Sequence, residues 1–156
     1  MRYFFDTEFI EDGITIDLIS IGIISEDRRT YYAENIDCDL GRADPWVQNN
    51  VVPHLVGPTT QFTRPKIARD IRAFVGENPE FWGYYCDYDW VLMCQLFGRM
   101  IDLPRGWPKF CLDLKQEMVR LKINKEDLPK QEGLLHHALD DAMWIRSAWK
   151  FIRSRA

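Results

Sequence analysis

The stretch RYFFDTEF at residues 2–9 decides the fold that this chain is expected to adopt. Its first half is apolar and aromatic, as in a strand at the centre of a sheet, and its second half turns abruptly acidic. Side chains alternate along a strand, so Asp6 and Glu8 project from the same face at the strand's end. Two adjacent carboxylates repel each other, and one pKa rises unless a cation lies between them. Taken alone, the pair also fits an ordinary strand end that faces water.

Two more strand patterns follow the first one at short intervals. DLISIGIIS at 17–25 is rich in β-branched residues, and TYYAEN at 30–35 continues the pattern. Turn-forming residues at 11–13 and 26–29 separate the three segments. Together with 2–9 they predict a three-stranded antiparallel meander.

The rest of the chain carries helical patterns with one further strand among them. The spacing of apolar residues predicts a strand at 81–86 and helices at 44–52, 64–78, 87–100, 113–122 and 136–155, the last beginning at about residue 137. This order predicts an α/β fold with a mixed central sheet and flanking helices. The length suits a single domain over residues 1–156.

Charge and composition narrow the classes of function. Lys plus Arg is 20 and Asp plus Glu is 24, a net charge of -4. This argues against a protein that coats long duplex DNA, because such binding uses many cationic contacts to phosphates. The four cysteines form no zinc-binding pattern and suit a reducing compartment. The early acids do not fit a secretory signal, and the apolar run at 18–24 is too short to span a bilayer. We therefore expect a soluble cytoplasmic protein with no membrane partner.

A second acidic segment, YYCDYDW at 84–90, lies where a predicted strand gives way to a helix. Asp89 at this helix start is explained by capping alone. It can also serve as a ligand, because α/β folds build their sites at the carboxyl ends of strands. Asp87 is the competing choice.

The third segment is HHALDDA at 136–142. Five residues of helix turn by roughly 140°, so His136 and Asp141 cannot face one point from inside a single helix. They converge if His136 lies in the loop just before the helix and Asp141 lies within it. Exposed loop histidines and acids that compensate the helix dipole are the ordinary explanations of such residues. Those explanations become less adequate when all three segments must be accounted for together.

The three segments, in this order, resemble the motifs of the DEDDh family of 3′–5′ exonucleases, which have the RNase H-like fold. The resemblance covers residues 1–25, 84–97 and 136–145. Within the family, RYFFDTEFIEDG, the following LISIGII and YDWVLMCQL are most similar to RNase AS, the polyadenylate-specific 3′-exoribonuclease group. Many DEDDh enzymes have an Asn shortly before the second-motif acid, and this chain has YYCDYD instead.

The resemblance assigns roles to matching positions. It implies that four carboxylates bind two Mg²⁺ ions, for which Mn²⁺ can substitute: Asp6, Glu8, Asp89 and Asp141. It places His136 at the general-base position. Motif spacing alone leaves Asp87 open as the second acid, and the YDWVLMCQL match favours Asp89. Two metal ions can stabilise both the attacking and the leaving oxygen in phosphodiester hydrolysis.

The resemblance also implies the reaction and the partners. It implies 3′–5′ hydrolysis of single-stranded RNA, with release of nucleoside 5′-monophosphates, a preference for adenylate-rich RNA and a homodimer. A DNA exonuclease and an oligoribonuclease-like enzyme share these motifs and stay open as alternatives. An inert interaction module predicts a missing acid or histidine, and none is missing. Phe9 is a candidate for stacking on the terminal base, or is simply a core residue.

Overall fold

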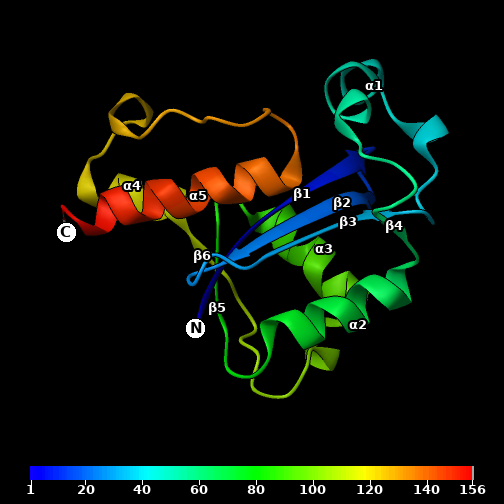
Figure 1. Ribbon diagram of the computed structural model, residues 1–156, viewed down its shortest axis with the longest axis horizontal. Helices are drawn as coiled ribbons and strands as arrows, with labels where there is room; N and C mark the ends of the chain where they lie inside the picture. The colour runs from blue at the N-terminus through cyan, green and yellow to red at the C-terminus, as the bar shows by residue number, and fades with distance from the viewer. Residues whose placement is uncertain (156) are drawn as a thin grey trace.

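The computed structural model describes residues 1–155, and its centre is a mixed sheet with helices on both faces (Figure 1). The strands are β1 (Arg2–Glu11), β2 (Ile16–Ser25), β3 (Thr30–Asn35), β4 (Gln61–Phe62), β5 (Glu80–Gly83) and β6 (Leu112–Asp113). Their order in the sheet is β4-β3-β2-β1-β5-β6. β1, β2 and β3 pair antiparallel, whereas β4, β5 and β6 each pair parallel with their inner neighbour. The predicted mixed sheet with an antiparallel meander is confirmed.

Helices cover the sheet unequally on its two faces. The α-helices are α1 (Pro45–Asn50), α2 (Arg64–Val75), α3 (Asp87–Phe97), α4 (Leu114–Leu121) and α5 (Ala138–Arg153), and short 3-10 helices are η1 (Leu40–Arg42), η2 (Val52–His54), η3 (Met100–Asp102) and η4 (Lys125–Asp127). In Figure 1, α5 runs across one face of the sheet, and α2 and α3 lie on the other. Among residues 1–155, no helix is both long and apolar enough to cross a bilayer.

Several predicted boundaries change in the structure. β1 continues to Glu11 because β2 pairs along it as far as that residue, so Asp6 and Glu8 lie inside the strand and not at its end. The strand expected over 81–86 ends at Gly83, and Tyr85 has the left-handed φ of 55°. The two-residue strands β4 and β6 were not predicted, because two residues show no period.

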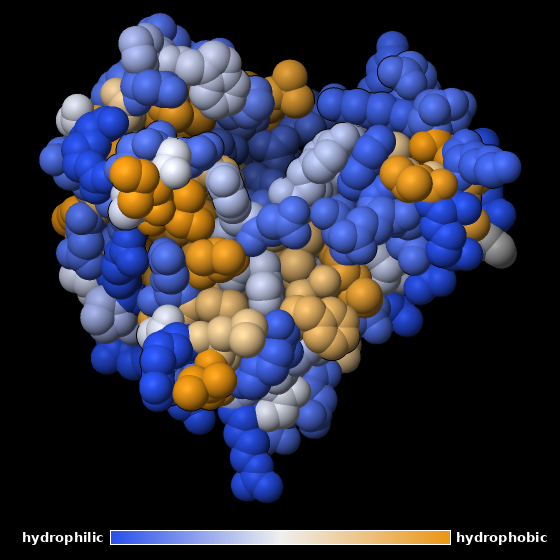
Figure 2. Space-filling model, turned by 180° about the vertical axis from the view of Figure 1, so that it is seen from behind, coloured by the Kyte–Doolittle hydropathy of each residue, from blue (hydrophilic) through white to orange (hydrophobic). Residues whose placement is uncertain are grey.

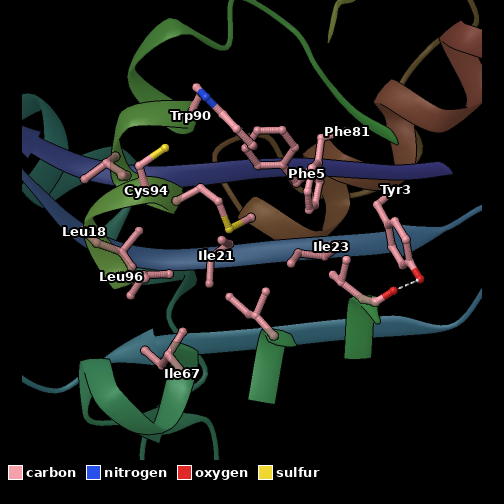
Figure 3. Close-up of a cluster of buried hydrophobic side chains, with 14 of the residues drawn as sticks. Tyr3, Phe5, Leu18, Ile21, Ile23, Ile67, Phe81, Trp90, Cys94 and Leu96 are labelled. Atoms are coloured by element: carbon pink, nitrogen blue, oxygen red, sulfur yellow. Dashed lines mark hydrogen bonds between the residues drawn. The ribbon is translucent and has the colours of Figure 1, made fainter. Parts of the chain in front are cut away.

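The alternation of β1 side chains fixes the two cores. Tyr3 and Phe5 point toward α2 and α3, where Phe5 packs with Phe81 and Trp90 (Figure 3). The Tyr3 hydroxyl donates a hydrogen bond to the carbonyl of Val75, drawn as the dashed line in Figure 3. Full burial of a phenylalanine side chain such as that of Phe5 contributes about 1.5–3 kcal/mol to the stability of the fold.

The other face of β1 packs against α5. Phe4 is buried there with Trp82 of β5 and with Ala142 and Ile145 of α5. Asp6 and Glu8 share the parity of Phe4 along the strand, so they face the same side as α5. Burial of the aromatic residues before them therefore sets the direction in which the two carboxylates point.

Candidate active site

A cleft of about 1240 Å³ lies over the middle of β1. Its walls come from β1, from residues 84–89 around the start of α3, from the 125–136 segment and from α5. Figure 2 shows a hollow near the top of the molecule with a floor of hydrophilic residues. The cleft gathers segments that are far apart in the sequence, including all three acidic segments.

The floor of the cleft is the part of β1 that pairs with β2 on one edge but not with β5 on the other. β5 pairs with β1 only from Arg2 to Phe4, so beyond Phe4 that edge of β1 has no partner strand among the described residues. Asp6 is partly buried there, and Glu8 is only 9% exposed. The register with β2 shifts between Glu8 and Phe9, where Ile19 of β2 has no partner in β1, so the extra residue of this β-bulge belongs to β2. Bulges bend a strand and re-aim its side chains, and they are frequent beside active sites.

Asp141 reaches this floor because α5 approaches the sheet closely. Gly22 of β2 pairs with Asp6, and a Cβ placed on Gly22 would lie 2.3 Å from the backbone nitrogen of Leu139. Only glycine permits this contact, so the first turn of α5 rests directly on the sheet beside Asp6. Ligand oxygens of Asp6, Glu8 and Asp141 all lie within 4.8 Å of one another.

Asp89 stands beside this group and is held by a different contact. It is 6% exposed, and its Oδ1 accepts a hydrogen bond from the Thr7 backbone nitrogen at 2.9 Å and another from the Thr7 hydroxyl. The Thr7 nitrogen can donate to Asp89 because β5 does not pair with this part of the β1 edge. Asp87 also lines the cleft, but it is exposed and makes no comparable contact with β1. The geometry therefore favours Asp89 over Asp87 as the second-segment acid.

Burial raises the pKa of all four carboxylates, and repulsion among the acids adds to the rise at Asp6 and Glu8. Burial, and then the charges of Asp89, Glu8 and Asp141, raise the pKa of Asp6 well above its usual range. Burial, followed by repulsion from Asp141 and Asp89, raises the pKa of Glu8 to about 8. Burial raises the pKa of Asp89 to about 6 against the opposing hydrogen bonds from Thr7. Burial likewise raises the pKa of Asp141, and a hydrogen bond from Gln131 opposes it.

The four acids form no ion pair with a Lys or Arg side chain among the described residues. None of the ion pairs between residues 1 and 155 includes Asp6, Glu8, Asp89 or Asp141. Buried carboxylates normally pair with a cation or coordinate a metal. Clustered carboxylate oxygens are the ligands that hard divalent cations prefer. The donor set therefore fits Mg²⁺ or Mn²⁺.

His136 lies in the loop just before α5 and lines the cleft, as its spacing from Asp141 requires. It has the left-handed φ of 61°, which is uncommon for a residue with a Cβ. Its backbone carbonyl is 3.3 Å from Nδ1 of His54, and its ring meets the ring of Trp46 edge-on at 4.8 Å. The neighbouring His137 occupies the N-cap position of α5 without a side-chain capping hydrogen bond, and its ring packs on Tyr32 at 4.7 Å. His137 does not line the cleft.

Phe9 lies at the edge of the acidic floor. Its ring is partly buried, lines the cleft and packs edge-on against Tyr88 at 5.7 Å. It also contacts the core beneath α3. Phe9 thus belongs to the core and presents one side to the cleft.

Two residues that support the acids were not singled out from the sequence. Thr7 holds Asp89, and Gln131 donates from Nε2 to Asp141 Oδ1 at 2.7 Å. Thr7 is only the residue between two acids, and strand alternation assigns it to the opposite face. Gln131 comes from a polar loop with no periodic pattern. The interior glycine of β2, Gly22, was the available signal for close approach of another segment.

Comparisons with known proteins agree with this geometry. Residues 1–153 match the family model described as the 3′-5′ exoribonuclease Rv2179c-like domain. The chain is 45% identical over 122 residues to 3′-5′ exoribonuclease Rv2179c of Mycobacterium tuberculosis (strain ATCC 25618 / H37Rv), covering 74% of this chain and 73% of that protein. The 3′-5′ exoribonuclease MT2234.1 of Mycobacterium tuberculosis (strain CDC 1551 / Oshkosh) matches with the same identity and the same coverage.

Solved structures show the same fold at low sequence identity. A 3′-exonuclease described in 3′-end specific recognition of histone mRNA stem-loop matches with a TM-score of 0.66 and 11% identity over 98% of this chain. E. coli Exonuclease I in complex with a dA16 oligonucleotide matches with a TM-score of 0.63 and 14% identity over 98%. The chain spans 63% and 40% of those two proteins. The predicted RNase H-like exonuclease fold is confirmed, and the chain belongs to the Rv2179c-like 3′-5′ exoribonuclease domain family.

Proposed function

We propose that this chain is a metal-dependent 3′–5′ exoribonuclease of the DEDDh type that shortens single-stranded RNA and releases nucleoside 5′-monophosphates. The observation that carries the proposal is the convergence of Asp6, Glu8 and Asp141 in one cleft with His136, in a member of an exoribonuclease family. Nothing in the ordinary packing of a sheet requires three unpaired carboxylates to meet there.

The acids suit two divalent cations, since two dications would offset four carboxylate charges. Two Mg²⁺ ions would be held by the four acids named above: Asp6, Glu8, Asp89 and Asp141. When bound, such ions stabilise charge on the phosphoryl group and activate water. The contacts from Thr7 and Gln131 orient Asp89 and Asp141 before an ion arrives, as hydrogen bonds to metal-binding carboxylates commonly do.

The chain's own residues supply the remaining chemistry. His136 takes the proton from the attacking water, because histidine changes charge near neutral pH. General-base help of this kind is worth about 10²–10⁴ in rate. Water attacks the phosphorus that joins the 3′-terminal nucleotide to the penultimate one, and the bond from that phosphorus to the penultimate 3′ oxygen breaks. The leaving 3′ oxygen takes up a proton to become a hydroxyl, His136 holds the proton of the attacking water, and the terminal nucleotide is released as a 5′-monophosphate.

The cleft suits a short single strand. Phe9, Tyr85 and Tyr88 supply aromatic faces for stacking, and Lys125 and Lys130 supply positive charge near its rim. Stacking of a base on an aromatic ring is worth about 1–3 kcal/mol and tolerates any base. The proposed preference for adenylate therefore rests on the resemblance to RNase AS and not on these aromatic rings.

A substrate panel tests the proposal. The protein is incubated with Mg²⁺ and poly(A), poly(U) or oligo(dA), and the products are resolved chromatographically. Mononucleotides from poly(A) alone are expected. Digestion of both RNAs would reject the adenylate preference, equal digestion of oligo(dA) would reject RNA specificity, and no digestion would reject the activity.

Three further parts of the expectation stay predictions. Residues 1–156 form one exonuclease domain, the protein acts in the cytoplasm, and it forms a homodimer. Light scattering coupled to size-exclusion chromatography tests the homodimer: a mass near twice 18.5 kDa supports it and a mass near 18.5 kDa rejects it.

A further inference from the structure

The segment that carries α1 and η2 contacts His136 at its ring and at its backbone carbonyl. Trp46 of α1 meets the His136 ring edge-on at 4.8 Å with an interplanar angle of 80°. His54 of η2 lies with Nδ1 3.3 Å from the His136 carbonyl oxygen. Neither Trp46 nor His54 lines the cleft, whereas His136 does. Both contacts therefore come from a segment that contributes no residue to the cleft lining.

The helix that carries Trp46 is packed against the sheet, although the Trp46 side chain itself is 52% exposed. Val47 and Val51 are buried in a small core with Ile10 of β1 and Ile19 of β2. The Asp44 side chain caps α1 by accepting a hydrogen bond from the Val47 nitrogen at 2.8 Å. Val47 and Val51 thus anchor the backbone next to Trp46 and η2 to the same sheet that carries the acids.

The backbone of His136 needs such support. Its φ of 61° is a conformation that a residue with a Cβ adopts at an energetic cost, and it persists when surrounding contacts hold it. A carbonyl oxygen only accepts hydrogen bonds, so the bond requires a proton on Nδ1 of His54. Edge-on packing of two rings adds a directional contact to the other side of the residue.

We propose that Trp46 and His54 are positioning residues that hold the His136 imidazole in its reactive orientation toward the cleft. The inference rests on the proposed function, in which His136 accepts the proton of the attacking water. Trp46 restricts the ring, and His54 fixes the backbone from which the ring projects. Displacement of a catalytic group by about 1 Å costs on the order of 10²-fold in rate.

Single substitutions test the two contacts. We expect Trp46→Ala and His54→Ala to lower kcat about tenfold or more, to leave KM within about twofold and to leave Mn²⁺ affinity unchanged by calorimetry. Trp46→Phe retains an aromatic edge, and His54→Asn retains a donor near the place of Nδ1, so both should recover most of kcat. Phe110→Ala, at an exposed aromatic residue outside the cleft lining, is the matched control and should change nothing.

A spectroscopic readout tests the contact between Trp46 and His136 in solution. The chain has three histidines, so their imidazole signals in a ¹³C-labelled sample are few, and His136→Ala identifies the signal of residue 136. Trp46→Ala removes the ring current of the indole and should shift that signal, whereas Phe110→Ala should not. An unmoved His136 signal in Trp46→Ala would contradict the inference.

A double-mutant cycle separates this inference from the proposed function. If Trp46 acts through His136, then Trp46→Ala should cause no further loss of kcat in the His136→Ala background. An equal loss in both backgrounds, or full kcat in both Trp46→Ala and His54→Ala, would overturn the inference and leave the function standing. Wild-type turnover in His136→Ala would instead overturn the general-base role itself.

Discussion

The close approach of α5 to the sheet makes Gly22→Ala the sharpest perturbation of the site. A Cβ at residue 22 would lie 2.3 Å from the Leu139 nitrogen and 2.4 Å from the Leu139 Cα, whereas ordinary contacts begin at 3.4 Å. Both partners are backbone atoms, so no side chain can rotate away. The first turn of α5 must therefore retreat from β2 by about 1 Å, the difference between those distances.

Two consequences follow from that retreat. Overpacking of this kind costs about 1–3 kcal/mol of stability. Asp141 lies in the displaced turn, and metal–ligand distances tolerate only about 0.2 Å, so metal affinity should fall with stability. A displacement of about 1 Å should also cost on the order of 10² in turnover.

Urea denaturation, Mn²⁺ calorimetry and RNA turnover measure these three effects in one variant. We expect a lower midpoint with an unchanged m-value, weaker metal binding and slower turnover. Gly41→Ala is the control, because its new Cβ would meet only the Asp39 carboxylate, on an exposed side chain, at 3.1 Å. A Gly22→Ala variant with wild-type midpoint and wild-type Mn²⁺ affinity would refute the role given to the helix contact.

Three other predictions address individual acids. Thr7→Val keeps the branched shape but removes the hydroxyl that donates to Asp89, so stability should fall by about 1–2 kcal/mol in urea titration; an unchanged midpoint would reject that bond. Asp89→Asn should lower turnover by about 10² or more while Asp87→Asn stays within about threefold, and the reverse result would assign the second acid to Asp87. In chelated protein, folded Glu8 keeps its proton up to a pKa of about 8, but the unfolded chain releases it near 4.5, so the contribution of Glu8 to stability should fall by roughly 3–4 kcal/mol from pH 5 to pH 8. The raised pKa values of Asp6, Asp89 and Asp141 act in the same direction. Equal urea midpoints at both pH values would show that Glu8 is not perturbed in this way.

The acid pair shows how far a local pattern can predict a site. Alternation along RYFFDTEF correctly placed Asp6 and Glu8 on one face, because this period follows from the backbone alone. The helical turn angle likewise placed His136 before the last helix. The extension of β1 to Glu11 depends on pairing with β2, which no pattern within β1 reports.

Contacts between distant segments lay outside the reach of sequence patterns. Thr7 and Asp89 are 82 residues apart, and so are His54 and His136. Such pairs form only when the whole sheet and its helices are assembled, and neither partner carries a local signal for the other. The convergence of Asp6, Glu8 and Asp141 followed from sequence motifs, whereas the contacts of Thr7 and Gln131 with the acids needed the structure.

The most direct test of the central claim follows one RNA strand from a fixed end. A 5′-labelled single-stranded RNA is incubated with Mg²⁺ and either wild-type protein or Asp6→Asn, which removes one charge from the centre of the carboxylate cluster. The account predicts a ladder that shortens by single nucleotides from the 3′ end with wild-type protein, and intact RNA with the variant or after chelation. Internal cuts, intact RNA with wild-type protein, or an Asp6→Asn variant as active as wild type would contradict it.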